Sequence, residues 1–298
     1  MAPVRLVTIE VNDCKSSGIL LADQSIVPLA AFGFNEVIDL INAGPAEWKR
    51  VEISHSSVAA KWKVDEVKFL APIPKTPRNL FCVGVNYKKH FDEGIRPENT
   101  SIPQSPVLFS KPWTCLTGHG NTVYIDRSAS QKVDWEAELA VVIGLGGVNI
   151  AVEEAMNHVF GWTLANDVSA RDLQLESGMF GQWFKGKSLD GFCPLGPAIV
   201  TCAEIPDYRN IAIRLRVNGV IKQSFSAGEM INSVERIISR VSLGQSLIPG
   251  DVILTGTSSG VGHWREPPEF LGEGDVVEIE SQQLGVLQTV FREVNVPK

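Results

Sequence analysis

The sequence predicts a β-rich α+β fold with a smaller N-terminal α+β domain. Three observations carry this prediction: strand-like runs outnumber helical patterns, an Asn-Gly pair joins two of these runs, and a proline-rich stretch divides the chain. With 298 residues and 44% hydrophobic composition, the chain can bury a large core. Because strands and helices do not alternate regularly, a parallel α/β sheet is disfavoured.

The small domain is predicted to occupy residues 1–72. Two strand-like runs, VRLVTIE and SIVPL, precede the helical pattern FNEVIDLINAG, in which Gly44 can serve as a C-cap. Pro72, Pro74 and Pro77 follow in APIPKTP and favour an extended connector, because proline restricts the residue before it. We therefore expect a second domain over residues 73–298.

The second domain contains most of the predicted strands. They are the runs NLFCVGV, VYID, WEAELAVVIG, IRLRV, VIKQSF, DVILT, DVVEIE and LGVLQTVFR. Asn218-Gly219, between IRLRV and VIKQSF, is a strong signal for a type I′ hairpin turn. The main helical patterns are VEEAMNHV and SVERIISRVSL.

Charge and composition exclude several classes of partner. A net charge of -7 and a pI near 5.4 give no electrostatic case for binding nucleic acid or an anionic membrane surface. The longest apolar run, LAVVIGLGGVNIAV, is broken by glycines and is too short to span a bilayer. Five scattered cysteines argue against a disulfide framework or a zinc site. We expect a cytoplasmic protein that acts on a small molecule, and a mitochondrial location is compatible with the sequence.

Two glutamates open the apolar strand VDWEAELAVVIG. Alternate strand residues share a face, so Glu136 and Glu138 point the same way, roughly 7 Å apart along the backbone. Ala140 and Val142 continue that face and require burial. Two like charges near an apolar region repel unless one is protonated or a cation lies between them. Taken alone, such a pair is more often a solvated face than a metal site.

A third carboxylate follows a second apolar run. In GWTLANDVSARDLQ, Asp167 comes at the end of a strand-like segment and before Ser169. A hard divalent cation such as Mg²⁺ needs oxygen ligands and would favour this third carboxylate beside the glutamate pair. Capping of the turn by Asp167 is the alternative.

Two further clusters carry groups with possible chemistry. In CVGVNYKKHFDEG, His90 and Glu93 are spaced i, i+3 on a short helical segment, so the carboxylate can orient the imidazole. An exposed histidine beside a glutamate is the alternative. Lys187 lies between turn-rich stretches in FKGKSLDGFCPLGP, where a lone lysine is usually just solvated.

Two partial motif matches are discounted. Residues 256–260 fit G-x-S-x-G, but a nucleophile elbow must launch a helix, and the glycines and prolines that follow disfavour one. GLGGVN lacks the third glycine of the dinucleotide fingerprint, because Asn149 occupies that position. Neither a serine hydrolase nor a dinucleotide-binding protein is predicted.

These segments, in this order, resemble the fumarylacetoacetate hydrolase family, and most of all its fumarylacetoacetate hydrolase domain-containing members. The resemblance covers about residues 75–295. It implies a mixed β-sandwich roll, usually found in homodimers. The motifs that carry it are CVGVNYKKH, VDWEAELAVVIG, GWTLANDVSARDLQ, GKSLDGFCPLGP, RVNGVIKQS and PGDVILTGTSSGVG.

The resemblance also implies roles for individual residues. It implies Glu136, Glu138 and Asp167 as ligands of Mg²⁺ or a related ion such as Mn²⁺ or Ca²⁺. The catalytic residues would be the dyad His90 and Glu93 together with Lys187, and the substrate contacts would be Arg171, Gln174 and Thr257.

The implied substrate is a 2-oxo acid with a 1,3-dicarbonyl. We rank acylpyruvate-type C–C bond hydrolysis through a metal-bound enolate first, with oxaloacetate decarboxylation or keto–enol tautomerisation as the alternative. A metal-stabilised binding or scaffold protein is the non-enzymatic alternative, which the intact dyad and lysine argue against. The segment LESGMFGQWF is expected to form an apolar lid through Met179, Phe180, Trp183 and Phe184.

Overall fold

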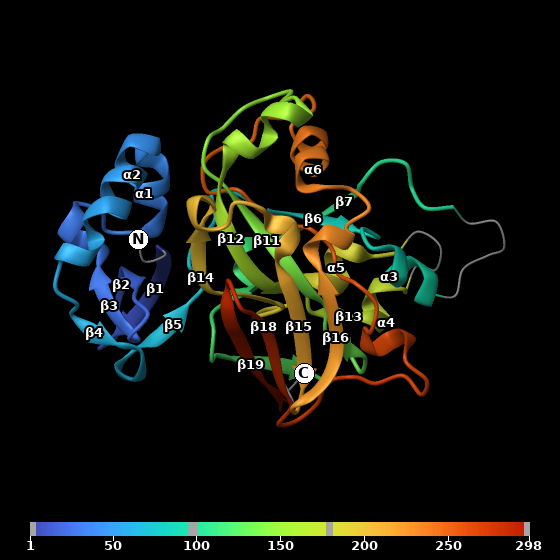
Figure 1. The fold of residues 1–298 in the computed structure, drawn as a ribbon. Coiled ribbons are helices and arrows are strands. Elements are labelled where there is room, and N and C mark those ends of the chain that lie inside the picture. The colour runs from blue at the N-terminus through green and yellow to red at the C-terminus, as the bar shows by residue number, and fades with distance from the viewer. Residues whose placement is uncertain (1–3, 95–100, 177–180, 295–298) are drawn as a thin grey trace.

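A large mixed sheet and a smaller second sheet form the centre of the molecule, which is represented by a computed structural model (Figure 1). The structure describes residues 4–94, 101–176 and 181–294. Within these ranges the strands form a twelve-stranded sheet, a five-stranded sheet and a two-stranded ribbon. The β-rich α+β class predicted from the sequence is confirmed.

The twelve-stranded sheet is antiparallel except at two strand pairs. Its main path, in spatial order, consists of β4 (Trp62–Lys63), β3 (Ser25–Pro28), β2 (Cys14–Leu20), β1 (Arg5–Val11), β14 (Cys193–Thr201), β12 (Val159–Asn166), β11 (Ala137–Ile143), β17 (Val252–Leu254), β6 (Leu80–Gly84) and β7 (Val107–Lys111). Beside this path, β5 (Lys68–Leu70) pairs with β1, and β8 (Leu116–Thr117) pairs with β14. The parallel pairs are β17 with β6 and β14 with β8, so the predicted mixed sheet is confirmed.

The five-stranded sheet contains the predicted hairpin. Its order is β16 (Val220–Ser226), β15 (Ala212–Val217), β18 (Val276–Ser281), β19 (Gly285–Val294) and β9 (Thr122–Asp126). Asn218 and Gly219 join β15 to β16 with φ angles of 50° and 78°. Positive φ at both central residues is what a type I′ turn requires, so the Asn-Gly prediction is confirmed.

The central strand β11 is buried on both faces and separates two cores. Leu139, Val141 and Ile143 pack in one cluster with apolar residues of the five-stranded sheet. Ala140 and Val142 belong to the other cluster, which includes residues of the N-terminal helices. Their burial is as predicted, and packing on both faces fixes the position of the residues with which β11 begins.

The N-terminal segment adds strands to one end of the large sheet and two helices beside it. These helices are α1 (Val37–Ala43) and α2 (Pro45–Ser54). Gly44 ends α1 with a φ of 85° and donates its N–H to the carbonyl of Ile41, as the C-cap prediction requires. Because Leu6 pairs with Ile199, the sheet continues from β1 into β14. The domain boundary near residue 72 stays a prediction.

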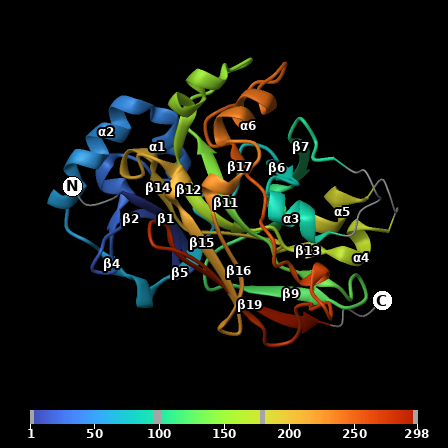
Figure 2. The ribbon, with the colours of Figure 1, turned by 45° about the vertical axis from the view of Figure 1, so that its right-hand side comes forward.

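The other helices are short. They are α3 (Lys88–Glu93), α4 (Arg171–Gln174), α5 (Trp183–Lys187) and α6 (Val234–Val241). The pattern VEEAMNHV forms a 3₁₀ helix, Val152–His158, in place of α-helix, whereas SVERIISRVSL forms α6. In both views α3, α4 and α5 lie at the end of the molecule opposite the N-terminal segment (Figures 1 and 2). None of the helices in the described ranges is long and apolar enough to cross a membrane.

A two-stranded ribbon joins the segments before β11 and after β12. It consists of β10 (Val133–Asp134) and β13 (Ser169–Ala170), with Asp134 opposite Ser169. Because β11 and β12 are themselves antiparallel neighbours, the ribbon continues their pairing beyond the large sheet. The polar residues between ribbon and sheet are therefore held close to one another.

Candidate active site

Three buried carboxylates meet where β11 begins and β12 ends. Glu136 precedes β11, Glu138 lies on it, and Asp167 directly follows β12. The N–H of Asp167 donates to the carbonyl of Glu136 at 2.9 Å, which fixes the third residue beside the pair. One carboxylate oxygen from each residue lies within 4.8 Å of the other two. The structure thus brings together the three residues that the resemblance implied as metal ligands.

The donor set fits a hard divalent cation. All three side chains offer oxygen, the ligand atom that Mg²⁺, Mn²⁺ and Ca²⁺ prefer. All three are also buried, with at most 5% of each residue exposed. Anionic groups taken out of water need a compensating positive charge. Glu136, Glu138 and Asp167 would therefore hold such an ion, although their geometry does not distinguish among the three metals.

The protein itself relieves part of the repulsion between the glutamates. Burial, the largest influence, raises the pKa of Glu138 well above its ordinary value, and the Asp167 and Glu136 carboxylates add to the shift. Burial acts in the same direction on Glu136, but Lys187 and Arg171 outweigh it and lower its pKa to about 2. Two like charges can be held together if one is protonated or if a cation lies beside them, and both occur here. The protonated form of Glu138 is favoured, and neighbouring cations stabilise the ionised form of Glu136.

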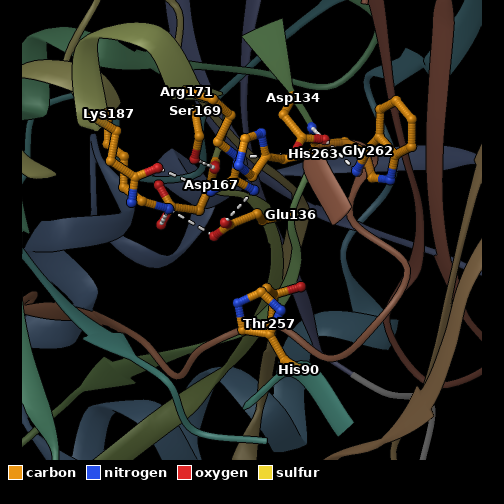
Figure 3. A network of polar contacts seen from close by, with 12 residues as sticks. His90, Asp134, Glu136, Asp167, Ser169, Arg171, Lys187, Thr257, Gly262 and His263 are labelled. Carbon is orange, nitrogen blue, oxygen red and sulfur yellow. Dashed lines mark hydrogen bonds and ion pairs between the residues drawn. The ribbon is translucent and has the colours of Figure 1, made fainter. Parts of the chain in front are cut away.

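Two cationic side chains hold Glu136 from either side. Lys187, at the end of α5, places its Nζ 2.7 Å from Glu136 Oε2 and 2.8 Å from Asp167 Oδ2. Arg171, which begins α4, forms an ion pair with Glu136 Oε1 at 2.7 Å. Figure 3 shows both cations converging on these carboxylates. The structure thus places Lys187 inside the carboxylate cluster, and the solvated alternative for this lysine is wrong.

A third cation, Lys111, was not predicted from the sequence. It ends β7, is fully buried, and donates from Nζ to Asp167 Oδ1 at 2.7 Å and to the backbone carbonyl of Lys187. Burial alone would lower the pKa of Lys111, but the Asp167 carboxylate more than offsets this and raises it above its ordinary value. A lysine at the end of the apolar run VLFSK is usually solvated, so nothing around Lys111 in the chain indicated a buried ion pair.

Asp134 was also missed, although its spacing contained a signal. It stands two residues before Glu136, on the alternation that places Glu136 and Glu138 on one face. It is fully buried, and its Oδ2 accepts from Arg171 Nε at 2.8 Å. Its Oδ1 accepts from the N–H of Gly262 at 2.7 Å. Asp134 therefore orients Arg171 and fixes the loop that follows β17.

Replacing Lys111 with methionine should destabilise the protein by about 3–5 kcal/mol, because it leaves Asp167 buried with one cation fewer. Urea unfolding of the metal-free protein measures the change in the free energy of unfolding. Lys185→Met is the matched control, since Lys185 is exposed and its loss should cost no more than about 0.5 kcal/mol. An unchanged unfolding midpoint for the Lys111 variant would show that Asp167 does not depend on this cation.

The predicted histidine–glutamate pair is formed. His90 and Glu93 lie on α3 with Nδ1 and Oε1 2.7 Å apart. The other oxygen, Oε2 of Glu93, accepts the N–H of Gly260 at 2.7 Å, so the carboxylate is fixed at both oxygens. A carboxylate partner favours the tautomer with its proton on Nδ1, which leaves the lone pair of Nε2 as a base.

The G-x-S-x-G segment, residues 256–260, donates backbone hydrogen bonds to the carboxyl groups of Glu138 and Glu93 and does not form a nucleophile elbow. The N–H of Gly256 donates to Glu138 Oε2 at 2.7 Å, and Gly260 binds Glu93 as described above. Gly256 has a φ of 98°, a conformation that favours glycine. The segment leads into a 3₁₀ helix, Gly262–Trp264, where an elbow would require an α-helix. This arrangement agrees with the expectation that G-x-S-x-G does not mark a serine hydrolase here.

A cavity of about 150 Å³ opens onto the carboxylates. Its polar lining includes all three residues implied as substrate contacts, Arg171, Gln174 and Thr257, together with His90, Glu136, Glu138, Lys187 and His263. Arg171 Nη1 donates to Gln174 Oε1 at 3.0 Å. The hydroxyl of Thr257 donates to the carbonyl of Ala137 at 2.8 Å, so it also holds the start of β11.

The expected lid is described only in part. Trp183 lines the cavity and packs edge-on against Phe109, with ring centroids 5.2 Å apart. Phe184 is exposed over 51% of its surface, so it does not contribute to an apolar cover. Met179 and Phe180 lie outside the described residues. The described part of the segment therefore supplies two apolar lining residues, Leu175 and Trp183.

The mixed sheet and the buried carboxylate cluster define a class of β-rich proteins with an acidic site suited to a divalent cation. The sequence over residues 79–292 matches the profile described as fumarylacetoacetate (FAA) hydrolase C-terminal. The chain belongs to the fumarylacetoacetate hydrolase family, as the sequence motifs indicated.

Relatives within this family are named as enzymes. The chain is 43% identical over 226 residues to oxaloacetate tautomerase YisK from Bacillus subtilis (strain 168), covering 76% of this chain and 73% of the relative. It is 47% identical over 223 residues to oxaloacetate tautomerase FAHD2A, mitochondrial, from Bos taurus, covering 74% and 68%. The two names agree on one reaction, and the bovine name places that relative in mitochondria.

Solved structures share the whole fold. Fumarylacetoacetate hydrolase (EaFAH) from the psychrophilic Exiguobacterium antarcticum superposes with a TM-score of 0.83 at 34% identity, covering 98% of this chain and 100% of that chain. A probable 2-hydroxyhepta-2,4-diene-1,7-dioate isomerase from Mycobacterium abscessus gives 0.81 at 31% identity, covering 98% and 100%. The fold therefore occurs in proteins described as a hydrolase and as an isomerase.

Proposed function

We propose that the protein is an oxaloacetate keto–enol tautomerase that requires a divalent cation. The observation that carries the proposal is the buried carboxylate cluster beside His90 in a small cavity with both polar and apolar lining residues. Relatives named oxaloacetate tautomerase support this reaction. Together they reverse the order expected from the sequence, in which acylpyruvate hydrolysis ranked first.

The size of the cavity favours a small substrate. Its volume of about 150 Å³ is below the ~300–1,000 Å³ that is usual for pockets holding drug-sized ligands. In an acylpyruvate an acyl group takes the place of the distal carboxylate of oxaloacetate, so an acylpyruvate is the larger molecule only when its acyl group is longer than acetyl. Trp183 and Leu175 on the apolar side of the cavity limit the space for such a group. A compact dicarboxylate is therefore the better fit.

The chemistry needs one proton to leave C3 of the substrate and one to reach the 2-oxo oxygen. A bound divalent cation would supply a Lewis acid that stabilises negative charge on substrate oxygens. His90, oriented by Glu93, is the base that takes the C3 proton at Nε2. The same imidazolium can return a proton, so no other bond breaks. Lys187 and Arg171 keep Glu136 ionised while the proton moves.

Product analysis tests this proposal. Oxaloacetate in its enol form is mixed with enzyme and Mg²⁺, and the loss of enol absorbance is compared with the metal-only background. We expect the enzyme to accelerate this loss without forming pyruvate, and EDTA to remove the acceleration. Formation of pyruvate and CO₂ in step with the absorbance change would identify a decarboxylase. No acceleration would favour the non-enzymatic alternative of a metal-stabilised binding protein.

Acylpyruvate hydrolysis is the second candidate, supported by the likeness to the Exiguobacterium hydrolase structure. It would require a water beside His90 and a distal carbonyl within the cavity. Pyruvate plus a carboxylic acid from an acylpyruvate, formed faster than oxaloacetate is tautomerised, would place this activity first. The expected homodimer and cytoplasmic location stay predictions, which sedimentation and cell fractionation can check.

A further inference from the structure

His263 lines the same cavity but was not among the residues implied by the resemblance. It lies in the 3₁₀ helix Gly262–Trp264, and its backbone N–H donates to Asp134 Oδ2 at 2.9 Å. The same oxygen accepts from Arg171 Nε at 2.8 Å. One buried carboxylate therefore holds His263 and Arg171 next to each other, as Figure 3 shows.

The imidazole of His263 has an unused hydrogen-bonding position. Its Nδ1 is buried and has no hydrogen-bond partner among the described residues. By contrast, His90 is bonded to Glu93, and Lys187 to Glu136. A buried polar atom without a partner is uncommon in folded proteins and requires an explanation.

The position of Nδ1 selects one tautomer. A buried N–H without an acceptor is rarer than a buried acceptor without a donor, so the ring proton of His263 is better placed on Nε2. Because Nδ1 is enclosed and His263 lines the cavity, we infer that the other edge of the ring, which carries Nε2, faces the cavity. His263 thus presents an N–H donor to the cavity, beside the positive charge of Arg171.

The cationic group beside this donor is the Arg171 guanidinium, which is paired with the carboxylates of Asp134 and Glu136. Burial, followed by the nearby Arg171 guanidinium, lowers the pKa of His263 below its ordinary value, so the ring is neutral at neutral pH. The ring packs edge-on against Trp264, with centroids 4.4 Å apart, which restricts its rotation. A neutral donor fixed next to a guanidinium is suited to a carboxylate oxygen.

We propose that His263, together with Arg171, binds the distal carboxylate of a dicarboxylate 2-oxo acid and so selects such acids over those with an apolar distal group. The inference deepens the proposed function, since it names the group that distinguishes oxaloacetate from an acylpyruvate. His263 is a specificity-determining residue in this assignment, and proton transfer remains with His90.

Malate and lactate provide a direct test, because both are 2-hydroxy acids and only malate has a distal carboxylate. Calorimetry on the Mg²⁺-supplemented protein gives both dissociation constants without turnover. We expect His263→Leu to weaken malate binding by about 10- to 100-fold, the effect of losing a hydrogen bond to a charged group. Lactate binding should be unchanged, and His263→Gln, which keeps a donor, should restore part of the malate affinity.

The controls separate this inference from the proposed reaction. The backbone N–H of His263 remains in both variants, so its bond to Asp134 is kept, and thermal unfolding checks that the fold is intact. His158→Leu removes a histidine that does not line the cavity and should leave the malate-to-lactate ratio unchanged. Equal losses for both ligands, unchanged malate binding in His263→Leu, or no wild-type preference for malate would overturn the assignment. A preserved malate preference without tautomerase activity would overturn only the proposed reaction.

Discussion

Replacing Glu138 with glutamine should abolish cation-dependent turnover while leaving the fold intact. The amide keeps the volume of the side chain and an oxygen that can accept the N–H of Gly256, now bonded to Glu138 Oε2 at 2.7 Å. It removes one of the three charges available to a cation. Loss of a residue that only orients a ligand costs about 10–100-fold in metal affinity, so loss of a ligand itself should exceed about 100-fold.

The Mn²⁺ affinity, measured by calorimetric titration, and the initial rate on oxaloacetate should therefore fall together in this variant. Metal-free Glu138→Gln should unfold at a temperature close to that of the wild type, because an amide avoids both the burial of a charge and the repulsion from Asp167 and Glu136 that together raise the pKa of Glu138. Glu153→Ala, at an exposed glutamate outside the cavity, is the control for both measurements. Wild-type activity of Glu138→Gln in EDTA would refute the metal site.

Replacing His90 with alanine should lower kcat by about 10²–10⁴, the usual contribution of a general base. The carboxylate cluster would be retained, so Mn²⁺ affinity should change little. Added imidazole should restore part of the rate, because the variant leaves room for a free base beside Glu93. A rate equal to that of the wild type would remove His90 from the proton transfer.

Glu93 should act through His90 rather than on the substrate. Glu93→Gln keeps an acceptor for Nδ1 but loses the charge that favours one tautomer, so kcat should fall by about 10–100-fold. An unchanged kcat would show that Glu93 only caps the loop through Gly260.

The size of the cavity helps to distinguish oxaloacetate tautomerisation from acylpyruvate hydrolysis, which the family resemblance could not separate. A volume of about 150 Å³ fits the compact dicarboxylate better than an acylpyruvate with a long acyl group. His263 and Arg171 then provide a specific reason for preferring a charged distal group. Variants that exchange these polar residues for apolar ones test whether selectivity depends on charge as well as on size.

Local patterns in the sequence determined the parts of the site that depend on short spacing. The strand period placed Glu136 and Glu138 on one face, and the i, i+3 spacing brought His90 to Glu93. The Asn-Gly hairpin likewise depends on the backbone of two residues. Each of these features requires the geometry of one strand, helical turn or hairpin, which is why the sequence alone was sufficient.

Only the tertiary structure decided the electrostatic balance of the site and the size of its cavity. Lys111 is buried because β7 ends beside Asp167, 56 residues away in the chain. Asp134 joins Arg171, 37 residues away, to His263, which is 129 residues away in the chain. The raised pKa of Glu138 follows first from burial and then from the carboxylates of Asp167, after β12, and Glu136, directly before β11. Charge stabilisation depends on distance and on exclusion of water, and neither is set until the segments pack together.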